Sequence, residues 1–396
     1  MGGFLSTRML GYVGPVLLLS AVSFLILTSH MQIEASTMTE WALPTVDSSP
    51  LGIFVSDGSV YFTEFWGNKI GRLDRSTGVF DEWTIPTGNS QPRSIFLSGD
   101  LVYFTEQSGN KIGRLDLATG IFIEWTIPTG DSRPIGIYVS NTLIYFTESQ
   151  GNKIGCLNPG TGVFNEWTVP TIGSRPHSIF VSSDLVYFTE QSGNKIGRLN
   201  PATGTFTEWT VPTDNSSPWS VFPFSGFVYF TEFDGNKIGC VDTATGVFTE
   251  WTVPTNQSYP HGLFVSGNVI YFTEYACNKI GRLNRSTGVF NEWIIPTNNS
   301  YPMGISVTGS LVYFTEYAGD KIGCLTVGAR YTLRFVRLLS SALYEEQDEE
   351  AAIRLEMWRW ALRYLPPDLP VIHMGQHHSW SWPSHTLRIT SMYKCT

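Results

Sequence analysis

Hydrophobic and polar residues alternate in short runs along most of the chain, and the runs return with a fixed spacing. One unit contains an apolar run such as Ser94–Leu97, an aromatic and β-branched run at Leu101–Glu106, and then Lys111–Leu115 and Ile121–Ile127. Pro, Gly-Asn and Thr-Gly turn sequences separate the four runs. Short runs joined by turn residues in this way predict four antiparallel strands linked as hairpins.

The unit is repeated seven times without an insertion or a deletion. A tryptophan returns every 42 residues, at Trp41, Trp83, Trp125, Trp167, Trp209, Trp251 and Trp293. The sequence Tyr-Phe-Thr-Glu ends with the same spacing at Glu64, Glu106, Glu148, Glu190, Glu232, Glu274 and Glu316. Four strands in such a unit are typical of a propeller blade rather than of a solenoid coil or a helical repeat. We therefore predict an all-β fold, a seven-bladed β-propeller of four-stranded antiparallel blades over residues 38–326.

The two ends of the repeat region predict how the ring closes. The repeats begin with an outer strand, Thr39–Pro44, and end with a third strand, Lys321–Leu325, after which no Glu-Trp strand follows. We predict that the N-terminal strand completes the seventh blade, because this pairing removes two open sheet edges.

The residues before the repeats have a different character. Met9–Leu27 contains no charged residue, and a helix of this length at about 1.5 Å per residue nearly crosses a hydrocarbon core of about 30 Å. Residues 1–37 therefore predict a hydrophobic helix and a linker, as either a retained membrane anchor or a signal peptide cleaved after Ala35. We expect the rest of the chain to be exported, membrane-anchored or secreted, with Arg8 on the cytoplasmic side.

Residues 327–396 do not continue the repeat pattern. Leu338–Leu365 has helical apolar spacing that Pro366-Pro367 ends, so we predict a non-repeat tail that is partly helical or disordered. Four tail histidines lack cysteine or carboxylate partners nearby in the sequence, and we assign no metal to them. These histidines are His373, His377, His378 and His385.

Composition and charge narrow the classes of function. The chain is 42% hydrophobic and 15% charged with 38 Gly, which is typical of a well-packed, turn-rich protein. Its formal net charge of -9 argues against a nucleic-acid partner. The five cysteines form no metal-ligand spacing. Cys156, Cys240 and Cys324 occupy one slot on alternate blades, too far apart for a disulfide, so we predict unpaired thiols there and at Cys277. We expect a monomer.

Tandem repeats also separate scaffold from site, because a residue that every blade needs appears seven times. By this criterion the repeated Trp, Glu and Lys residues are structural. We predict that each repeated Glu accepts a hydrogen bond or pairs with the Lys five positions on, as Glu64 with Lys69.

Three variable slots carry the candidate site. They follow the Pro that opens each blade, precede that Pro, or follow the repeated Glu, and all three should lie at one end of the central channel. One arc is aromatic, with Trp219, Phe233, Tyr259, Tyr275, Tyr301, Tyr317, Phe65 and Trp66. The opposite arc carries Arg93, Gln107, Arg133, Arg175, His177 and Gln191. This combination predicts a small-molecule or peptide ligand with an aromatic part and an acidic or polar part.

The repeated units, Glu-Trp-Thr-Ile-Pro-Thr followed by Pro-x-Gly-Ile, Tyr-Phe-Thr-Glu and Gly-Asn-Lys-Ile-Gly-Arg-Leu, closely resemble those of the streptogramin B lyase (virginiamycin B lyase) family over about residues 38–326. The resemblance implies a propeller. It also implies an enzyme that opens the ester-closed ring of a cyclic depsipeptide by elimination, with Mg²⁺. Family chemistry uses a His after the blade-opening Pro in two successive blades, a Glu two residues before the second His, and a Glu after the inner-strand motif of that blade.

No assignment of these family positions recovers more than one of the four groups. With His261 as the second His, the preceding blade has Trp219, and the two Glu slots hold Tyr259 and Tyr275. With His261 as the first His, its partner slot holds Met303.

The other histidine fits no better. With His177 as the second His, the preceding blade opens with Arg133-Pro134-Ile135, and Arg175 and Gln191 stand in the Glu slots. His261 is therefore the one catalytic candidate. Three functions stay open: an exported propeller that binds a ligand or partner, a carbon–oxygen lyase that acts on a cyclic depsipeptide, and a purely structural role.

Overall fold

The computed structural model describes residues 25–56, 58–339, 380–382 and 385–387. Ala35–Ala329 forms one compact unit. The other unit includes the antiparallel hairpin of β29 (Trp380–Trp382) and β30 (His385–Leu387). The predicted apolar helix at 9–27 lies outside the described residues except for its last three, which begin a strand. Residues 340–365 of the predicted tail helix and three of the tail histidines also lie outside them.

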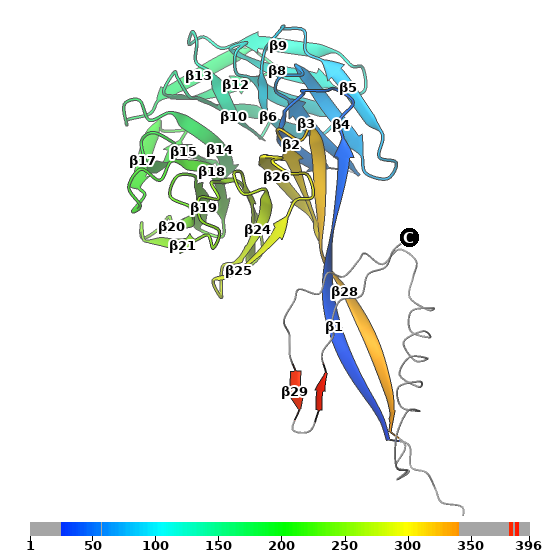
Figure 1. The fold of residues 1–396 in the computed structure, drawn as a ribbon. Helices are drawn as coiled ribbons and strands as arrows, with labels where there is room; N and C mark the ends of the chain where they lie inside the picture. Colours follow the sequence, from blue (N-terminus) through cyan, green and yellow to red (C-terminus); the bar gives the residue numbers. More distant parts are fainter. Residues whose placement is uncertain (1–24, 57, 340–379, 383–384, 388–396) are drawn as a thin grey trace, which may run out of the picture. The chain divides into compact units, whose positions relative to one another are not determined.

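The larger unit consists of seven four-stranded antiparallel sheets arranged around a central channel, which confirms the predicted propeller (Figure 1). The first three blades are β2 (Pro50–Ser56), β3 (Ser59–Glu64), β4 (Lys69–Asp74) and β5 (Phe80–Thr84); β6 (Pro92–Ser98), β7 (Leu101–Glu106), β8 (Lys111–Asp116) and β9 (Phe122–Thr126); and β10 (Pro134–Ser140), β11 (Leu143–Glu148), β12 (Lys153–Asn158) and β13 (Val163–Thr168). The next three are β14 (Pro176–Ser182), β15 (Leu185–Glu190), β16 (Lys195–Asn200) and β17 (Thr205–Thr210); β18 (Pro218–Phe224), β19 (Phe227–Glu232), β20 (Lys237–Asp242) and β21 (Phe248–Thr252); and β22 (Pro260–Ser266), β23 (Val269–Glu274), β24 (Lys279–Asn284) and β25 (Val289–Ile294). In the described part of the chain, no helix is long and apolar enough to cross a membrane.

The seventh blade closes the ring as predicted. It contains β26 (Pro302–Thr308), β27 (Leu311–Glu316) and β28 (Lys321–Leu339), and β1 (Leu25–Ala42) is the outer strand beside β28. Both closing strands are longer than the repeat pattern predicts, because β28 continues past Leu325 to Leu339 and β1 starts at Leu25.

Polar contacts hold the closure together. The Asp320 carboxylate accepts hydrogen bonds from the backbone N–H groups of Asp47 and Ser49, both at 2.8 Å. Six other blades place an Asn in this slot, such as Asn68, whose Nδ2 donates to two carbonyl groups of the following loop. In the seventh blade, the Asp320 carboxylate therefore binds the N-terminal segment only by accepting hydrogen bonds. The side-chain amide of the equivalent Asn in the other blades also donates hydrogen bonds.

A tight contact between neighbouring strands fixes the interior of each blade. Phe62 is fully buried and pairs across the sheet with Gly71. A Cβ atom on Gly71 would lie 2.1 Å from the Phe62 ring, so a glycine is the residue that lets this ring lie over the next strand. The same Phe–Gly pair recurs in all seven blades.

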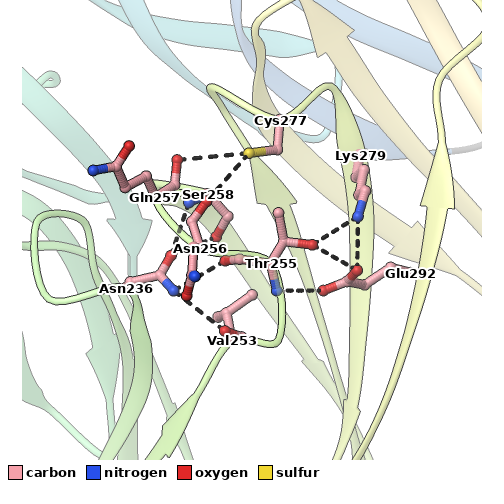
Figure 2. Close-up of polar contacts among 9 residues, drawn as sticks. All are labelled: Asn236, Val253, Thr255, Asn256, Gln257, Ser258, Cys277, Lys279 and Glu292. Atoms are coloured by element: carbon pink, nitrogen blue, oxygen red, sulfur yellow. Dashed lines mark hydrogen bonds and ion pairs between the residues drawn. The ribbon is translucent and has the colours of Figure 1, made fainter.

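Neighbouring blades are joined by a repeated Lys–Glu–Thr contact, which corrects the predicted Glu–Lys pairs. Lys69 Nζ lies 2.6 Å from Glu82 Oε2 and 2.6 Å from Thr45 Oγ1, in the loop that follows the preceding blade. Figure 2 shows the equivalent contact of Lys279, Glu292 and Thr255. Glu64 faces Lys69 in the backbone ladder. The lysine, however, extends to the outer strand on its other side and binds the glutamate there.

The repeated inner glutamates are instead buried without a hydrogen-bond partner. Glu64 and its six equivalents have no exposed surface, and neither carboxyl oxygen has a partner. Burial and the neighbouring Glu82 charge raise the pKa of Glu64 to about 8, although Lys69 opposes the shift. The pKa values of Glu106, Glu274 and Glu316 are also raised to about 8, and those of Glu148, Glu190 and Glu232 to about 7.

The raised glutamate pKa values predict that stability falls as pH rises from 6.5 to 8.5. The folded state binds more protons than the unfolded state in this pH range. Each glutamate therefore lowers the free energy of unfolding by up to about 1.4 kcal/mol for each unit by which the pH rises. We expect a decrease in the free energy of unfolding of more than about 1 kcal/mol per pH unit. Urea denaturation at several pH values measures it.

A pair of variants in one blade checks the cause of this pH dependence. Glu106→Gln should increase the free energy of unfolding more at pH 8.5 than at pH 6.5, because the buried carboxylate that it removes is charged at the higher pH. Glu124→Gln weakens the contacts with Lys111 and Thr87 and should destabilise it at both pH values. Equal destabilisation by the two variants at pH 8.5 would contradict this account.

Ring closure predicts that the N-terminal strand is essential for stability. Deleting residues 38–45 should lower the melting temperature by more than about 10 °C and cause association through the open edge of β28. The point variant Glu40→Ala, which removes the acceptor for Thr297 and Lys321, should cost about 1–3 kcal/mol. Glu82→Ala is its matched control, because it removes the same kind of Lys and Thr contacts from a blade whose four strands are consecutive in the sequence. An unchanged melting temperature in the truncated chain would contradict closure of the ring by this strand.

Candidate functional site

The inner strands of the seven blades line a cavity of about 260 Å³ on the propeller axis. Its first layer consists of the residues that follow the blade-opening Pro, namely Leu51, Arg93, Ile135, His177, Trp219, His261 and Met303. The variable slots share this end of the channel, because the backbone N–H of Phe65 donates to Ser49 O at 3.1 Å and all seven blades repeat this bond. We refer to this end, with the three slots around it, as the channel mouth.

Below the mouth, the channel is lined by small residues and then by aromatic rings. The small layer contains Gly52, Ser94, Gly136, Ser178, Ser220, Gly262 and Gly304. A Cβ at Gly52 would lie 2.5 Å from the carbonyl oxygen of Arg93 in the next blade, so the blades approach each other closely here. The aromatic layer contains Phe54, Phe96, Tyr138, Phe180, Phe222 and Phe264, with neighbouring ring centroids 4.4–5.0 Å apart.

The aromatic layer, which we call the collar, was missed in the sequence. Ser306 takes the collar position in the seventh blade and interrupts the sequence of ring contacts. The sequence does contain a pattern that predicts the collar, because the fourth residue after the blade-opening Pro is aromatic in six of the seven blades. The criterion that treats repeated residues as scaffold hides such a layer, because a repeated residue can also line the channel.

Arg93 crosses the mouth and contacts one residue of its own blade and residues of two other blades. One guanidinium nitrogen lies 3.1 Å from Gln107 Oε1, and another lies 3.0 Å from His177 Nε2. The guanidinium carbon lies 5.9 Å from the centroid of the Trp219 ring. Arg93 reaches its partner two blades away over Ile135, which is short and buried.

The two histidines of the mouth lie on either side of Trp219. The ring centroid of Trp219 is 4.0 Å from that of His177 and 5.0 Å from that of His261. Both histidines are buried. Burial and the charge of Arg93 hold the pKa of His177 well below its usual range and lower the pKa of His261 to about 3. Both imidazoles are therefore neutral at pH 7.

The hydrogen bonds assign the tautomers of the two histidines. An arginine only donates, so His177 Nε2 accepts from Arg93 and the proton resides on Nδ1. A carbonyl only accepts, so His261 Nδ1 donates to Met303 O at 3.2 Å. His261 Nε2 consequently carries a lone pair, but the low pKa makes this nitrogen a weak base at neutral pH.

Most of the predicted aromatic arc forms one continuous surface. Phe233 contacts Trp219, Tyr259 and Tyr275 with ring centroids 5.0, 4.9 and 5.9 Å apart. Tyr275 also contacts Tyr301 at 4.9 Å.

A second part of the arc surrounds Tyr317. Its hydroxyl accepts a hydrogen bond from Trp66 Nε1 at 2.9 Å, and its ring lies 6.4 Å from that of Phe65. Trp66 is 59% exposed, so this part of the arc lies at the rim of the mouth.

The predicted basic arc is not a separate half of the mouth. Arg93 and His177 contact Trp219 directly, so basic and aromatic residues meet in one cluster. Arg133 and Arg175 are exposed, and neither lines the cavity. Both have left-handed backbone conformations with φ of 52°. The residue before the blade-opening Pro has this conformation in every blade, so the strain belongs to the scaffold rather than to a site.

The chain matches known propellers over the region that contains this site. A model of the virginiamycin B lyase family matches residues 30–224 and 185–337. The chain belongs to the virginiamycin B lyase family. Crystal structures of virginiamycin B lyase from Staphylococcus aureus are 36% identical to it, with a TM-score of 0.69, and cover 74% of this chain and 99% of theirs.

Further comparisons give the same result. One of the Staphylococcus aureus structures is a catalytically inactive variant with quinupristin. A streptogramin B lyase structure is 35% identical with a TM-score of 0.68, and covers 74% of this chain and 98% of its own. Comparison with curated protein sequences finds no match.

The residues at the mouth do not fit the divalent metal that the family resemblance implies. Among the described residues, no group of three or more His, Cys, Asp or Glu side chains could hold a metal ion. With His261 as the second family His, Tyr259 and Tyr275 stand in the slots of the two glutamates, and their phenols replace the carboxylate oxygens that Mg²⁺ prefers. The charged group that faces His177 is Arg93, which would repel a cation. The described residues at the mouth therefore do not support a mechanism that uses Mg²⁺.

The cysteines agree with the sequence prediction. Cys156, Cys240, Cys277 and Cys324 are free, and all but Cys277 are buried. Cys395 lies outside the described residues.

The buried Arg93–histidine contact predicts that His177 and His261 stay neutral between pH 5 and pH 8. Arg93→Gln should raise both histidine pKa values, because it removes a nearby positive charge, although burial should keep them below the usual value of about 6.5. Long-range ¹H–¹⁵N NMR of the imidazole nitrogens measures the pKa values and the tautomers. Arg282→Gln, in β24, the third strand of its blade, is the control and should change neither. A midpoint near pH 6.5 for either histidine in the unmodified protein would refute the predicted burial.

Proposed function

We propose that this chain is an exported propeller that binds an amphipathic small molecule or peptide at the channel mouth and acts as a monomer. The observation that carries the proposal is the cluster at the mouth, where Arg93 adjoins the aromatic surface of Trp219 and Phe233. An open channel end with aromatic walls and a few convergent polar groups is typical of small-molecule sites. Export rests on the apolar segment Met9–Leu27 and involves either a membrane anchor or a cleaved signal.

Family membership supports a ligand of the streptogramin B type. A related enzyme has been solved with quinupristin, and a cyclic depsipeptide presents carbonyl acceptors along its backbone. In this chain, Trp219, Phe233 and Tyr275 supply aromatic faces and Arg93 supplies donors.

Lyase activity is the second candidate, and the similarity to virginiamycin B lyases over 74% of the chain favours it. Elimination requires a base for the proton and stabilisation of the charge that develops. His261 Nε2 is the available base, but its pKa of about 3 is poorly matched to neutral pH. Tyr259 and Tyr275 supply no carboxylate. Binding without turnover is therefore the function that these residues support best.

Binding and turnover can be separated with one compound. Isothermal titration calorimetry of the full chain with quinupristin should give saturable binding that does not depend on Mg²⁺. Trp219→Ala should weaken it at least about tenfold, because burying an aromatic face contributes roughly 1–3 kcal/mol. Thr203→Ala, at a turn on the opposite face, is the control and should leave binding unchanged.

Chromatography of the same mixtures tests the alternative. Elimination leaves the mass of the compound unchanged, so the ring-opened form is detected by its retention time. We expect no conversion. Mg²⁺-dependent conversion that is lost in His261→Ala would establish the lyase instead, and the absence of any binding would refute the proposed ligand.

A further inference from the structure

Two buried polar groups in the channel have no partner in the described part of the protein. Neither Trp219 Nε1 nor His177 Nδ1 is accessible to solvent, and neither has a partner at hydrogen-bond distance. The Trp219 backbone is near enough to His177 to oppose the lowering of its pKa. Leaving a buried polar group unpaired is energetically unfavourable. His177 is only 6% exposed, so solvent does not relieve this cost. An unpaired group of this kind in a ligand cavity indicates a missing partner.

Both unpaired groups are hydrogen-bond donors. The indole nitrogen of Trp219 only donates. The contact of Arg93 with His177 Nε2 leaves the imidazole proton on Nδ1. Arg93 itself has five N–H groups, and in the described part of the chain its side chain forms hydrogen bonds with Gln107 and His177. The cluster therefore presents an excess of donors, and the complementary group is an acceptor.

The charge around these donors indicates which acceptor they bind. The residues that line the cavity include one arginine and no aspartate or glutamate. Both lining histidines are neutral, as described above, so the cavity has a net charge of one positive unit. The chain as a whole has a formal net charge of -9. A positive cavity in an acidic protein favours an anion with a single charge over a cation or a dianion.

We propose that Arg93, with His177 and Trp219, binds the carboxylate of a carboxylic acid whose aromatic or aliphatic part lies against Phe233 and Tyr275. A short linear peptide with an apolar C-terminal residue has this chemistry. The inference rests on the proposed ligand site at the mouth and specifies the charge of its ligand. Guanidinium and carboxylate match in planar geometry and form strong charge-assisted hydrogen bonds.

This specificity distinguishes ring-closed from ring-opened depsipeptides. The ester that closes the ring is neutral. When such a ring opens by elimination, the carbon–oxygen bond breaks, its electron pair stays on the carboxyl oxygen, and a base takes the proton of the neighbouring carbon as the alkene forms. The opened form thus carries the carboxylate that the cavity fits, and it should bind more tightly than the closed form.

The test uses N-acetyl-phenylalanine and its neutral analogue N-acetyl-phenylalaninamide, with calorimetry on the full chain. The acid should bind at least about tenfold more tightly than the amide. Arg93→Gln should abolish the preference, and Arg93→Lys should retain part of it because the charge remains. Arg282→Gln, in β24, the third strand of its blade, is the charge-matched control and should keep the full preference. Melting temperatures of all variants identify any that fail to fold.

The outcomes separate this inference from the proposed function. Equal binding of acid and amide, with both lost in Trp219→Ala, would overturn the carboxylate inference while the ligand site stands. A preference for the acid that persists in Arg93→Gln would also overturn it. Binding of neither compound would overturn it as well, and the quinupristin titration then decides whether the mouth is a ligand site at all.

Discussion

The propeller depends on the contact in which each blade's Lys–Glu pair binds a threonine from the preceding blade. Lys69, Glu82 and Thr45 form one of seven such contacts, with Nζ–Oε2 distances of 2.6–3.1 Å over the seven pairs. The partners are partly buried, so the interaction is less screened than a surface ion pair. It fixes the loop that enters the next inner strand, and the first residues of that strand form the channel mouth. The position of Arg93 or His177 in the channel therefore follows from contacts at the outer side of the blades.

The fold could be predicted in detail because every blade repeats the same 42-residue pattern. Strand positions, the ring of seven and its closure by the N-terminal strand all follow from that pattern. The Glu64–Lys69 pair was predicted wrongly, because residues opposite each other on a hairpin are adjacent in the ladder while a long lysine can extend to the strand on its other side. A repeat identifies the strands but does not say which of two neighbours a side chain reaches.

The candidate site was only partly predictable for a related reason. Variation between blades located the mouth, and the same end of the channel holds Arg93, His177 and Trp219. The contact between Arg93 and His177 joins residues 84 positions apart in the sequence. It depends on the curvature of the ring and on a short Ile135 between them. Neither property can be read from a linear comparison of blades, which is why two separate arcs were predicted where one cluster is found.

Ring closure also has a consequence for how the chain is made. The last interaction of the ring joins Glu40 with Lys321, which are 281 residues apart. During synthesis the outer strand of the last blade is produced first, and it has no sheet to join until the other six blades and three more strands have emerged. An unpaired strand is a site for wrong pairing with other chains. Contacts this distant in sequence also form slowly. The growing chain must therefore keep this strand free of other partners until synthesis has passed Lys321, 281 residues after Glu40.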